Sequence, residues 1–321
     1  MPLLAVRHVT TYRYRQAAAF GEHRMMLRPR EGHDQRILDA RLDIAPAPVE
    51  LRWLQDVFGN SVAVARFSGR AAELRFDSSV LLVHKPRAAD DLRLDDHAAQ
   101  WPFSYGSEEG ADLSRSIERR FADPGREVDR WARRFARADG PTDTLEMLSG
   151  ITHAVRREFA YVAREDGGTQ APDRTLRLGS GTCRDFAVLM MEAVRSLGLA
   201  ARFVSGYLYS PGRDGGGGRG HVGGGATHAW VRVYLPGAGW VEFDPTNGIV
   251  GNRDLIRVAV AREASQAVPL SGTWTGFPAD SLGMTVEVHV TSAEPADAGA
   301  GDENAPDRAA AAASASAVAL V

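Results

Sequence analysis

The sequence GSGTCRDFAVLM, residues 179–190, contains Cys183, the only cysteine in a chain of 321 residues. A turn of small residues precedes this cysteine, and apolar side chains follow it at the three- and four-residue spacing of a helix. The apolar positions of the run are Phe186, Leu189, Met190, Ala193, Val194 and Leu197. The pattern predicts a helix that begins at Cys183 and ends at Gly198, because glycine favours helix C-termini.

Cys183 lies in the first turn of this predicted helix. A thiol in that place experiences the positive end of the helix dipole and several unpaired backbone N–H groups, and both favour the thiolate. The position therefore suits a nucleophile. A single cysteine is nevertheless more often a small, buried apolar residue. The position of Cys183 alone leaves both interpretations open.

The composition narrows the class of protein. A length of 321 residues favours two domains, and a single cysteine excludes an intrachain disulfide or a zinc site with two or four thiolates. The net charge of −3 gives no indication of a nucleic-acid-binding or basic membrane-binding surface. The chain begins MPLLAVRHVTTYRYR, without a basic leader before an apolar core, and no stretch approaches the ~20 apolar residues of a membrane span. We expect a cytoplasmic protein that binds neither nucleic acid nor membranes.

Residues 3–86 contain β-rich runs separated by Gly, Pro and Asn residues that favour turns. The runs are VRHVTTYRYR, ILDARLDIAP, ELRWLQDVFGNSVAVARF and AAELRFDSSVLLV. Several short strands in a segment of this length are typical of an antiparallel sandwich or an open barrel. We predict an N-terminal antiparallel β-sandwich domain at residues 1–88.

From about residue 112 the hydrophobic period becomes helical. Val128, Trp131 and Phe135 share one helix face, and a second helical pattern over residues 145–159 follows Thr142, its expected N-cap. Strands are then expected in the order ARFVSGYLY, HAWVRVYL, GWVEFD, DLIRVAVA and GMTVEVHV. A helical lobe followed by an antiparallel sheet indicates an α+β domain, which we place at residues 89–292.

Two segments have low sequence complexity. RDGGGGRGHVGGG, residues 213–225, lacks the Gly-Lys-Ser/Thr ending of a phosphate-binding loop and leads from no strand into a helix. We expect a flexible surface loop there. Residues 293–321 are rich in Ala, Asp and Pro and are predicted to form a disordered tail.

His228 and Asp244 lie on consecutive strands of a predicted hairpin, HAWVRVYLPGAGWVEFD. With a five-residue loop, the apolar residues share one face and Arg232 lies opposite Glu242. The same register sets Tyr234 opposite Trp240 and Trp230 opposite Asp244. Asp244 is then a diagonal neighbour of His228, ~7 to 8 Å away between backbones, and can accept a hydrogen bond from its ring.

This pair matters because a catalytic thiolate needs an imidazole partner, and the imidazole needs a third group to orient it. Taken singly, His228 could be a surface residue of a strand, and Asp244 could be a turn residue before Pro245. Their shared side of one hairpin favours the joint interpretation.

Other candidate groups are less favourable. The histidines without a carboxylate at an informative spacing are His8, His23, His33, His84, His97, His153 and His289, and His221 is expected to be solvated in the glycine-rich loop. Asp185 is expected to stabilise the helix N-terminus, although its charge opposes thiolate formation, and Arg184 either offsets that charge or faces solvent. No Gly-x-Ser-x-Gly motif is present. Adjacent carboxylates such as Asp90 and Asp91 point in different directions and do not suit a glycosidase.

Separated segments of this sequence resemble the bacterial transglutaminase-like family. GSGTCRDFAVLMMEAVRSLGLAARFVSGYL and HAWVRVYLPGAGWVEFDPTNG resemble its core, which carries Cys, His and Asp in that chain order on a papain-like α+β fold. TTYRYR, HRMMLRPR and DVFGNSV resemble the β-sandwich that often precedes this core. The resemblance covers residues 3 to about 292. By position it implies that Cys183 is the nucleophile, His228 the general base and acid, and Asp244 the orienting residue.

The resemblance further implies acyl transfer or hydrolysis at amide bonds of peptides or proteins through a thioester, without a metal or an organic cofactor. Backbone N–H groups at the start of the Cys183 helix would hold the oxyanion, and Gln170 is a candidate second donor by analogy with thiol enzymes of this fold. Two alternatives remain: a cysteine protease or amidase without transamidation, and a non-catalytic protein-binding module. The glycine-rich loop is a candidate lid over the cleft.

Overall fold

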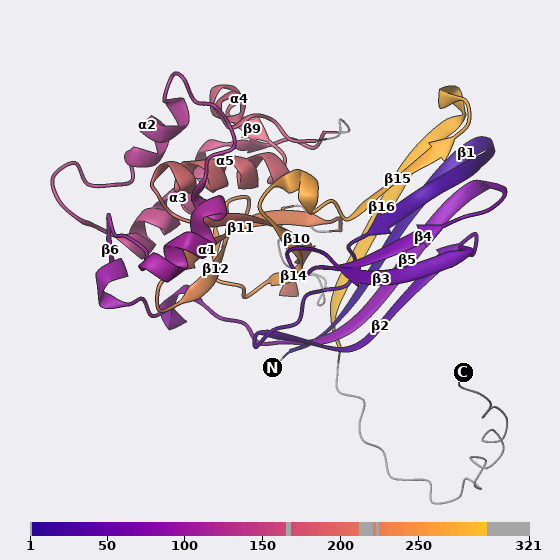
Figure 1. Cartoon of the computed structure of the whole chain (residues 1–321), viewed down its shortest axis with the longest axis horizontal. Coiled ribbons are helices and arrows are strands. Elements are labelled where there is room, and N and C mark those ends of the chain that lie inside the picture. Colours follow the sequence, from indigo (N-terminus) through magenta and orange to yellow (C-terminus); the bar gives the residue numbers. More distant parts are fainter. Residues whose placement is uncertain (1, 165–167, 212–220, 223–224, 294–321) are drawn as a thin grey trace, which may run out of the picture.

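The computed structural model describes residues 2–164, 168–211, 221–222 and 225–293. Most of the glycine-rich loop predicted at 213–225, with its proposed role as a lid, lies outside the described residues, as does the tail beyond residue 293. Figure 1 shows a long curled antiparallel sheet on one side of the molecule and a unit of helices and shorter strands on the other. This arrangement confirms the predicted α+β class.

The N-terminal strands form one antiparallel sheet with the order β2-β5-β1-β4-β3. Their bounds are β1 (Leu3–Met25), β2 (Gln35–Ala45), β3 (Glu50–Gln55), β4 (Ser61–Arg66) and β5 (Arg70–His84). Buried and solvent-facing residues alternate along most of the long strand β1, as expected for a strand with one face on a core. Where the sequence predicts a sandwich or an open barrel, the structure has a single sheet that curls (Figure 1).

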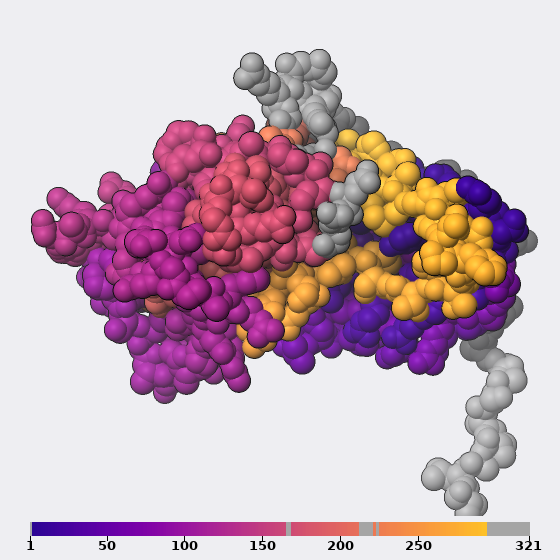
Figure 2. All heavy atoms as spheres, turned by 90° about the horizontal axis from the view of Figure 1, so that it is seen from above, coloured from indigo at the N-terminus to yellow at the C-terminus, as the bar shows by residue number. Residues whose placement is uncertain are grey.

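Two strands from the end of the described chain complete this sheet. β15 (Leu270–Thr275) and β16 (Ser281–Ala293) both pair with β1 in antiparallel fashion. Figure 2 shows these yellow C-terminal strands beside the indigo N-terminal strand. Residues 270–292 are predicted in the second domain, and GMTVEVHV in its sheet, whereas in the structure both strands belong to the first sheet. Alternation of apolar residues specifies which face of a strand is buried, but not which distant strand it pairs with.

Two apolar clusters hold the curled sheet in place. The first lies within the sheet and includes Tyr14, Phe20 and Phe76. The second joins Leu4 and Leu82 of the sheet to residues of the second unit, among them Tyr207, Ile256 and Val258. Since the second cluster is continuous across the two units, it fixes one face of the curled sheet against the back of the smaller sheet.

Among the described residues, the second unit contains five α-helices and a five-stranded sheet, together with short paired segments. The helices are α1 (Ser107–Ile117), α2 (Glu127–Arg133), α3 (Thr144–Glu158), α4 (Pro172–Leu178) and α5 (Cys183–Ser196). The sheet has the order β13-β12-β11-β10-β14, with β10 (Ala201–Leu208), β11 (His228–Leu235), β12 (Gly239–Asp244), β13 (Ile249–Val250) and β14 (Leu255–Ala261). Two-residue strands form the pairs β6 (Gln100–Trp101) with β7 (Thr142–Asp143), and β8 (Ala160–Tyr161) with β9 (Ser180–Gly181). Single 3-10 turns occur at Ala89–Asp91, Asp96–Ala98, Ala264–Gln266 and Pro278–Asp280.

The central helix α5 begins at Cys183 and is followed by Gly198, with φ +83°, as the sequence predicts. Nearly all of its residues are buried, because it packs between the other helices and strands β10 and β11. The Thr182 side chain caps its N-terminus by accepting from the Asp185 N–H, and the Asp185 carboxylate accepts from the Thr182 N–H. In α3 the capping side chain is Asp143 rather than the predicted Thr142.

A buried ionic cluster also joins the two units. Arg257 of β14 donates to both carboxylate oxygens of Asp34, at 2.9 Å each, and to Glu242 of β12 at 2.8 Å. The side chains of all three residues are 10% exposed or less. Arg232 of β11 forms a further ion pair with Glu242. The cluster anchors the loop that leads into β2 to the sheet of the second unit.

Candidate active site

Cys183 occupies the first position of α5 and is a free, buried thiol with 7% of its surface exposed. Gly181 lies two residues before it, where a Cβ atom would come within 2.8 Å of the Asp185 side chain. The small residues before the cysteine therefore allow the chain to approach the first turn of the helix closely. In the described part of the chain, the N–H groups of Cys183 and Arg184 have no hydrogen-bond partner, as expected for the first turn of a helix.

The β11–β12 hairpin has the predicted register. Arg232 lies opposite Glu242, and Tyr234 lies opposite Trp240. His228 begins β11 and Asp244 ends β12, and their side chains meet: His228 Nε2 lies 2.9 Å from Asp244 Oδ2. Both side chains are completely buried.

Asp244 is held by the turn that follows it. Its Oδ1 accepts from the N–H of Thr246 at 2.9 Å, and its Oδ2 accepts from Asn247 Nδ2 at 2.8 Å. The first of these bonds is the local side-chain-to-backbone pattern that aspartate forms in turns. Asp244 can therefore stabilise the turn through Oδ1 and contact His228 through Oδ2 at the same time. The contact of Asn247 with this carboxylate is not among the sequence-based predictions. It could have been predicted, because Asn247 lies in the same DPTN turn, three residues after Asp244.

The electrostatics of the pair favour an ion pair. Burial lowers the pKa of His228, but the charge and the hydrogen bond of Asp244, together with the Cys183 thiol, raise it by more, so the net pKa lies above the ordinary imidazole value. Burial would raise the pKa of Asp244, but the charge of His228 and the hydrogen bonds from His228 and Asn247 lower it below the usual carboxyl range. A charged imidazole is thus stabilised in a buried position.

The remaining nitrogen of His228, Nδ1, is the atom available to the thiol. The Cys183 thiol contributes to the raised pKa of His228, so the thiol lies within electrostatic range of the ring. Nδ1 is buried and has no hydrogen-bond partner within the described residues. The thiol and the ring therefore lie near each other without a direct hydrogen bond. Such looser contacts are common before substrate binds.

Residues 4–83 match the bacterial transglutaminase-like N-terminal region, and residues 129–245 match the transglutaminase-like superfamily. The chain belongs to the transglutaminase-like superfamily. The predicted resemblance is confirmed, and the second match spans Cys183, His228 and Asp244.

Several known proteins are similar to this transglutaminase-like chain over most of its length. An uncharacterised protein of Mycobacterium leprae is 26% identical over 289 residues, covering 89% of this chain and 98% of its own length. An uncharacterised protein of Mycobacterium tuberculosis strain H37Rv is 28% identical over 293 residues, covering 88% of this chain and 91% of its own. A crystal structure described as a candidate cysteine protease from Cytophaga hutchinsonii has a TM-score of 0.65 at 17% identity, and covers 91% of this chain and 92% of that chain. This likeness shows a shared fold.

In this transglutaminase-like core, Asp185 is neutralised by an arginine that the sequence analysis did not single out. Arg164 Nη2 donates to both oxygens of Asp185, at 2.8 and 3.0 Å, while the Arg184 side chain has no hydrogen bond or ion pair within the described residues. Burial would raise the pKa of Asp185, but the N–H groups of Gln170 and Thr182 and side-chain hydrogen bonds lower it. Asp185 therefore stabilises the first turn of α5 as predicted, and Arg164 supplies the charge that balances it.

Gln170, the candidate second oxyanion donor, is engaged elsewhere in the structure. Its Nε2 lies 3.3 Å from both the Ser180 carbonyl and Asp185 Oδ2, and its backbone N–H donates to Asp185 Oδ1 at 2.6 Å. The side-chain oxygen is buried without a hydrogen-bond partner in the described part of the chain. The Gln170 amide thus stabilises the turn before Cys183, and its N–H groups are not free to donate to an oxyanion.

The other histidines of the transglutaminase-like chain do not approach Cys183 in any contact that the structure describes. His8 contacts Tyr207 at 2.9 Å in the apolar layer between the units, and His221, expected to be solvated, lies 3.0 Å from Asp254. Within the described residues, no group of three or more His, Cys, Asp or Glu side chains is arranged to hold a metal ion. None of the described helices combines the length and the apolar character needed to cross a bilayer.

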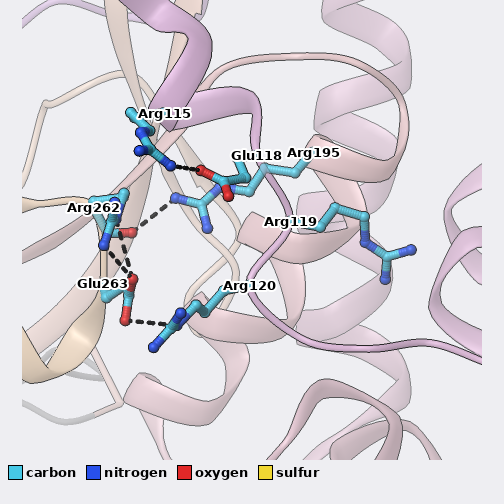
Figure 3. Close-up of a pocket in the computed structure, with 7 residues that line it drawn as sticks. All are labelled: Arg115, Glu118, Arg119, Arg120, Arg195, Arg262 and Glu263. Carbon is cyan, nitrogen blue, oxygen red and sulfur yellow. Dashed lines mark hydrogen bonds and ion pairs between the residues drawn. The ribbon is translucent and has the colours of Figure 1, made fainter.

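A pocket rich in arginine lies at the opposite end of α5 from Cys183 (Figure 3). It has a volume of about 300 Å³. Arg115 pairs with Glu118, Arg120 and Arg262 pair with Glu263, and the fully buried Arg195 donates to Glu192 and to backbone carbonyls. The guanidinium of Arg119 points away from the others in Figure 3. Neighbouring carboxylates and carbonyls thus engage these cations, and Arg195 joins the end of α5 to the backbone of Ser116 and Ala201.

Proposed function

We propose that this protein is a thiol enzyme that transfers or hydrolyses acyl groups at amide bonds of peptides or proteins through a thioester on Cys183. His228 acts as the general base and acid, and Asp244 orients and charges the imidazole. The observation that carries this proposal is the buried 2.9 Å contact between His228 and Asp244, beside a free thiol at the N-terminus of α5. A scaffold that only bound a partner would have no physical need for all three groups together.

The first half of the reaction forms the acyl-enzyme. The Cys183 thiolate attacks the amide carbonyl, and the carbonyl π electrons move onto oxygen to give a tetrahedral oxyanion. The N–H groups of Cys183 and Arg184 have no partner within the described residues, and they support this step as donors to the oxyanion. The imidazolium of His228 then gives its proton to the nitrogen of the amide as the C–N bond breaks, and an amine leaves.

The second half resolves the thioester. Neutral His228 takes a proton from water or from a second amine, and the resulting nucleophile attacks the thioester carbonyl. The C–S bond breaks, the thiolate leaves, and the imidazolium is restored. Asp244 remains ionised throughout and stabilises the imidazolium whenever it forms. Water as acceptor gives hydrolysis, and an amine as acceptor gives transamidation.

The direct test measures both acceptors with one set of substrates. Glutamine-containing peptides are incubated with a labelled primary amine, and amine incorporation, ammonia release and peptide cleavage are followed together. We expect at least one of these activities in the native protein and none in Cys183→Ala. Incorporation without cleavage assigns transamidation, and cleavage without incorporation assigns a protease or amidase. The same rate in Cys183→Ala, or no activity in either protein, would contradict the proposal and favour a binding module.

A further inference from the structure

A groove lies between helix α2, the end of α3 and the end of α4. Its volume is about 430 Å³. The lining residues are Glu127, Arg130, Trp131, Arg134, Glu158, Phe159, Leu176, Arg177 and Gly179. Gly179 lies four residues before Cys183, and its carbonyl accepts from the N–H of Ala160 in β8 at 2.8 Å. The groove therefore borders the small β8–β9 pair that leads into the thiol.

A row of aromatic rings connects the groove with the surroundings of Cys183. The rings of Trp131 and Phe159 lie 6.1 Å apart, Phe159 and Phe186 lie 5.9 Å apart, and Phe186 and Tyr161 lie 6.5 Å apart, all in edge-to-face orientation. Phe186 is three residues after Cys183, on the next turn of α5. Edge-to-face pairs at these separations are mutually stabilising. The row thus forms a continuous apolar support from the groove to the helix turn that carries the thiol.

Tyr161 is at the active-site end of this row. It lies opposite Gly181 in the parallel β8–β9 pair, and 39% of its surface is exposed. Burial raises the pKa of Tyr161, and the charge of Cys183 raises it further, so the thiol is within electrostatic range of the phenol. Tyr161 therefore presents a partly exposed aromatic ring close to the buried thiol.

The backbone of β8 offers an unpaired edge. Among the described strands, β8 pairs only with β9. An extended peptide can add to such an edge through main-chain hydrogen bonds. Since a strand rises about 3.3 Å per residue, Phe159 in the groove lies roughly 7 Å along the chain from Tyr161. A substrate segment of two or three residues spans that distance.

In the part of the chain that the structure describes, one arginine of the groove has no ion-pair partner. Arg134 pairs with Glu158, and Arg177 pairs with Glu127 and Asp173. Arg130 has neither an ion pair nor a side-chain hydrogen bond within the described residues, and it is exposed on α2. Within the described residues, the groove thus combines the apolar side chains of Phe159 and Leu176 with the unpaired positive charge of Arg130.

We propose that this groove binds the peptide segment next to the reactive amide, with an aliphatic or aromatic side chain over Phe159 and Leu176 and an acidic side chain at Arg130. The segment lies extended along the open edge of β8. This inference rests on the proposed function, since it takes Cys183 as the point of attack. It assigns a substrate class, namely peptides with an apolar residue and an acidic residue within a few positions of the reactive amide.

The test measures binding, so that it does not depend on turnover. Two fluorescently labelled peptides each contain one glutamine. The first carries a Leu-Glu pair before the glutamine and the second carries it after the glutamine, so that both chain directions are tested. A reference peptide carries Ser-Lys instead. Fluorescence anisotropy with full-length Cys183→Ala protein should give a dissociation constant about ten-fold lower for one Leu-Glu peptide than for the reference, as expected for burial of a leucine side chain.

Two charge-reversal variants on the same background locate the effect. Arg130→Glu should weaken binding of the preferred peptide by about five-fold, in the range of exposed ion pairs. Arg174→Glu is the matched control, because Arg174 is an exposed arginine of α4 that does not line the groove, and it should leave binding unchanged. Equal binding of all peptides, or equal loss in both variants, would overturn the inference. Labelling of Cys183 by iodoacetamide is measured separately in the native protein, so that a failure of the proposed function is seen independently.

Discussion

Under the proposed mechanism, the His228→Gln variant is expected to lose amide turnover by a factor of at least about 1,000. Glutamine keeps a polar side chain in the buried position beside Asp244, but it cannot carry the proton between the thiol and the leaving amine. It also removes the positive charge that the buried Asp244 stabilises. The measurement is kcat/KM of the variant against the native protein, with whichever acceptor the native enzyme uses.

His289→Gln is a suitable control for this variant. His289 lies in β16 and is exposed, so the same chemical change there should leave kcat/KM within a factor of two. A thermal melt of each variant separates loss of chemistry from loss of folding, because His228 is buried and its substitution also costs stability. If folded His228→Gln protein retained more than a tenth of native turnover, the role of His228 as general acid and base would be wrong.

The second large effect is expected in the ionic cluster between the two units. Arg257→Met leaves Asp34 and Glu242 buried without their shared cation, and removing one partner of a buried pair costs about 3–5 kcal/mol. For a chain of this size, we expect the midpoint of thermal unfolding to fall on the order of 10 °C. Circular dichroism at neutral pH measures it. The matched control is Arg13→Met, which breaks an exposed pair with Glu73 and should cost less than about 1 kcal/mol.

The same cluster predicts a dependence of stability on pH. Burial would raise the pKa of Asp34, but the hydrogen bond and charge of Arg257 lower it far below the usual carboxyl value. A carboxyl group with a lowered pKa in the folded state contributes its stability at pH values above the ordinary carboxyl pKa, about 4, and loses it as the pH falls. The difference in stability between native protein and Arg257→Met should therefore be largest near neutral pH and shrink in acid. A difference that stayed constant down to strongly acidic pH would contradict this account of the cluster.

The sequence allows the centre of the site to be predicted because local rules determine it. The small residues before Cys183 and the apolar spacing after it specify where α5 begins, and the structure agrees. Cross-strand pairing is equally local in a hairpin with a short loop, since one correct pair, such as Arg232 with Glu242, fixes all the others. The proximity of His228 and Asp244 follows from that register.

Other contacts depend on residues far apart in the chain, and the sequence pattern does not specify them. β16 alternates like any strand with one buried face, but its partner, β1, lies more than 250 residues earlier in the sequence. Arg164 reaches Asp185 from a segment without periodicity, and the groove forms only where α2, α3 and α4 meet. These features can be recognised only in the folded structure. The hydrophobic period of a helix or strand shows which of its faces is buried, but not which other element covers that face.

The most direct test of the central claim is the pH dependence of Cys183 alkylation by iodoacetamide, in the native protein and in His228→Gln. In the proposed mechanism Asp244 holds the His228 imidazole charged beside the thiol, so the native protein should be alkylated rapidly even near pH 6. The variant should react appreciably only as the pH approaches that of an ordinary cysteine thiol, about 8.5. Two superimposed profiles, both rising only near pH 8.5, would contradict an ion pair between Cys183 and His228.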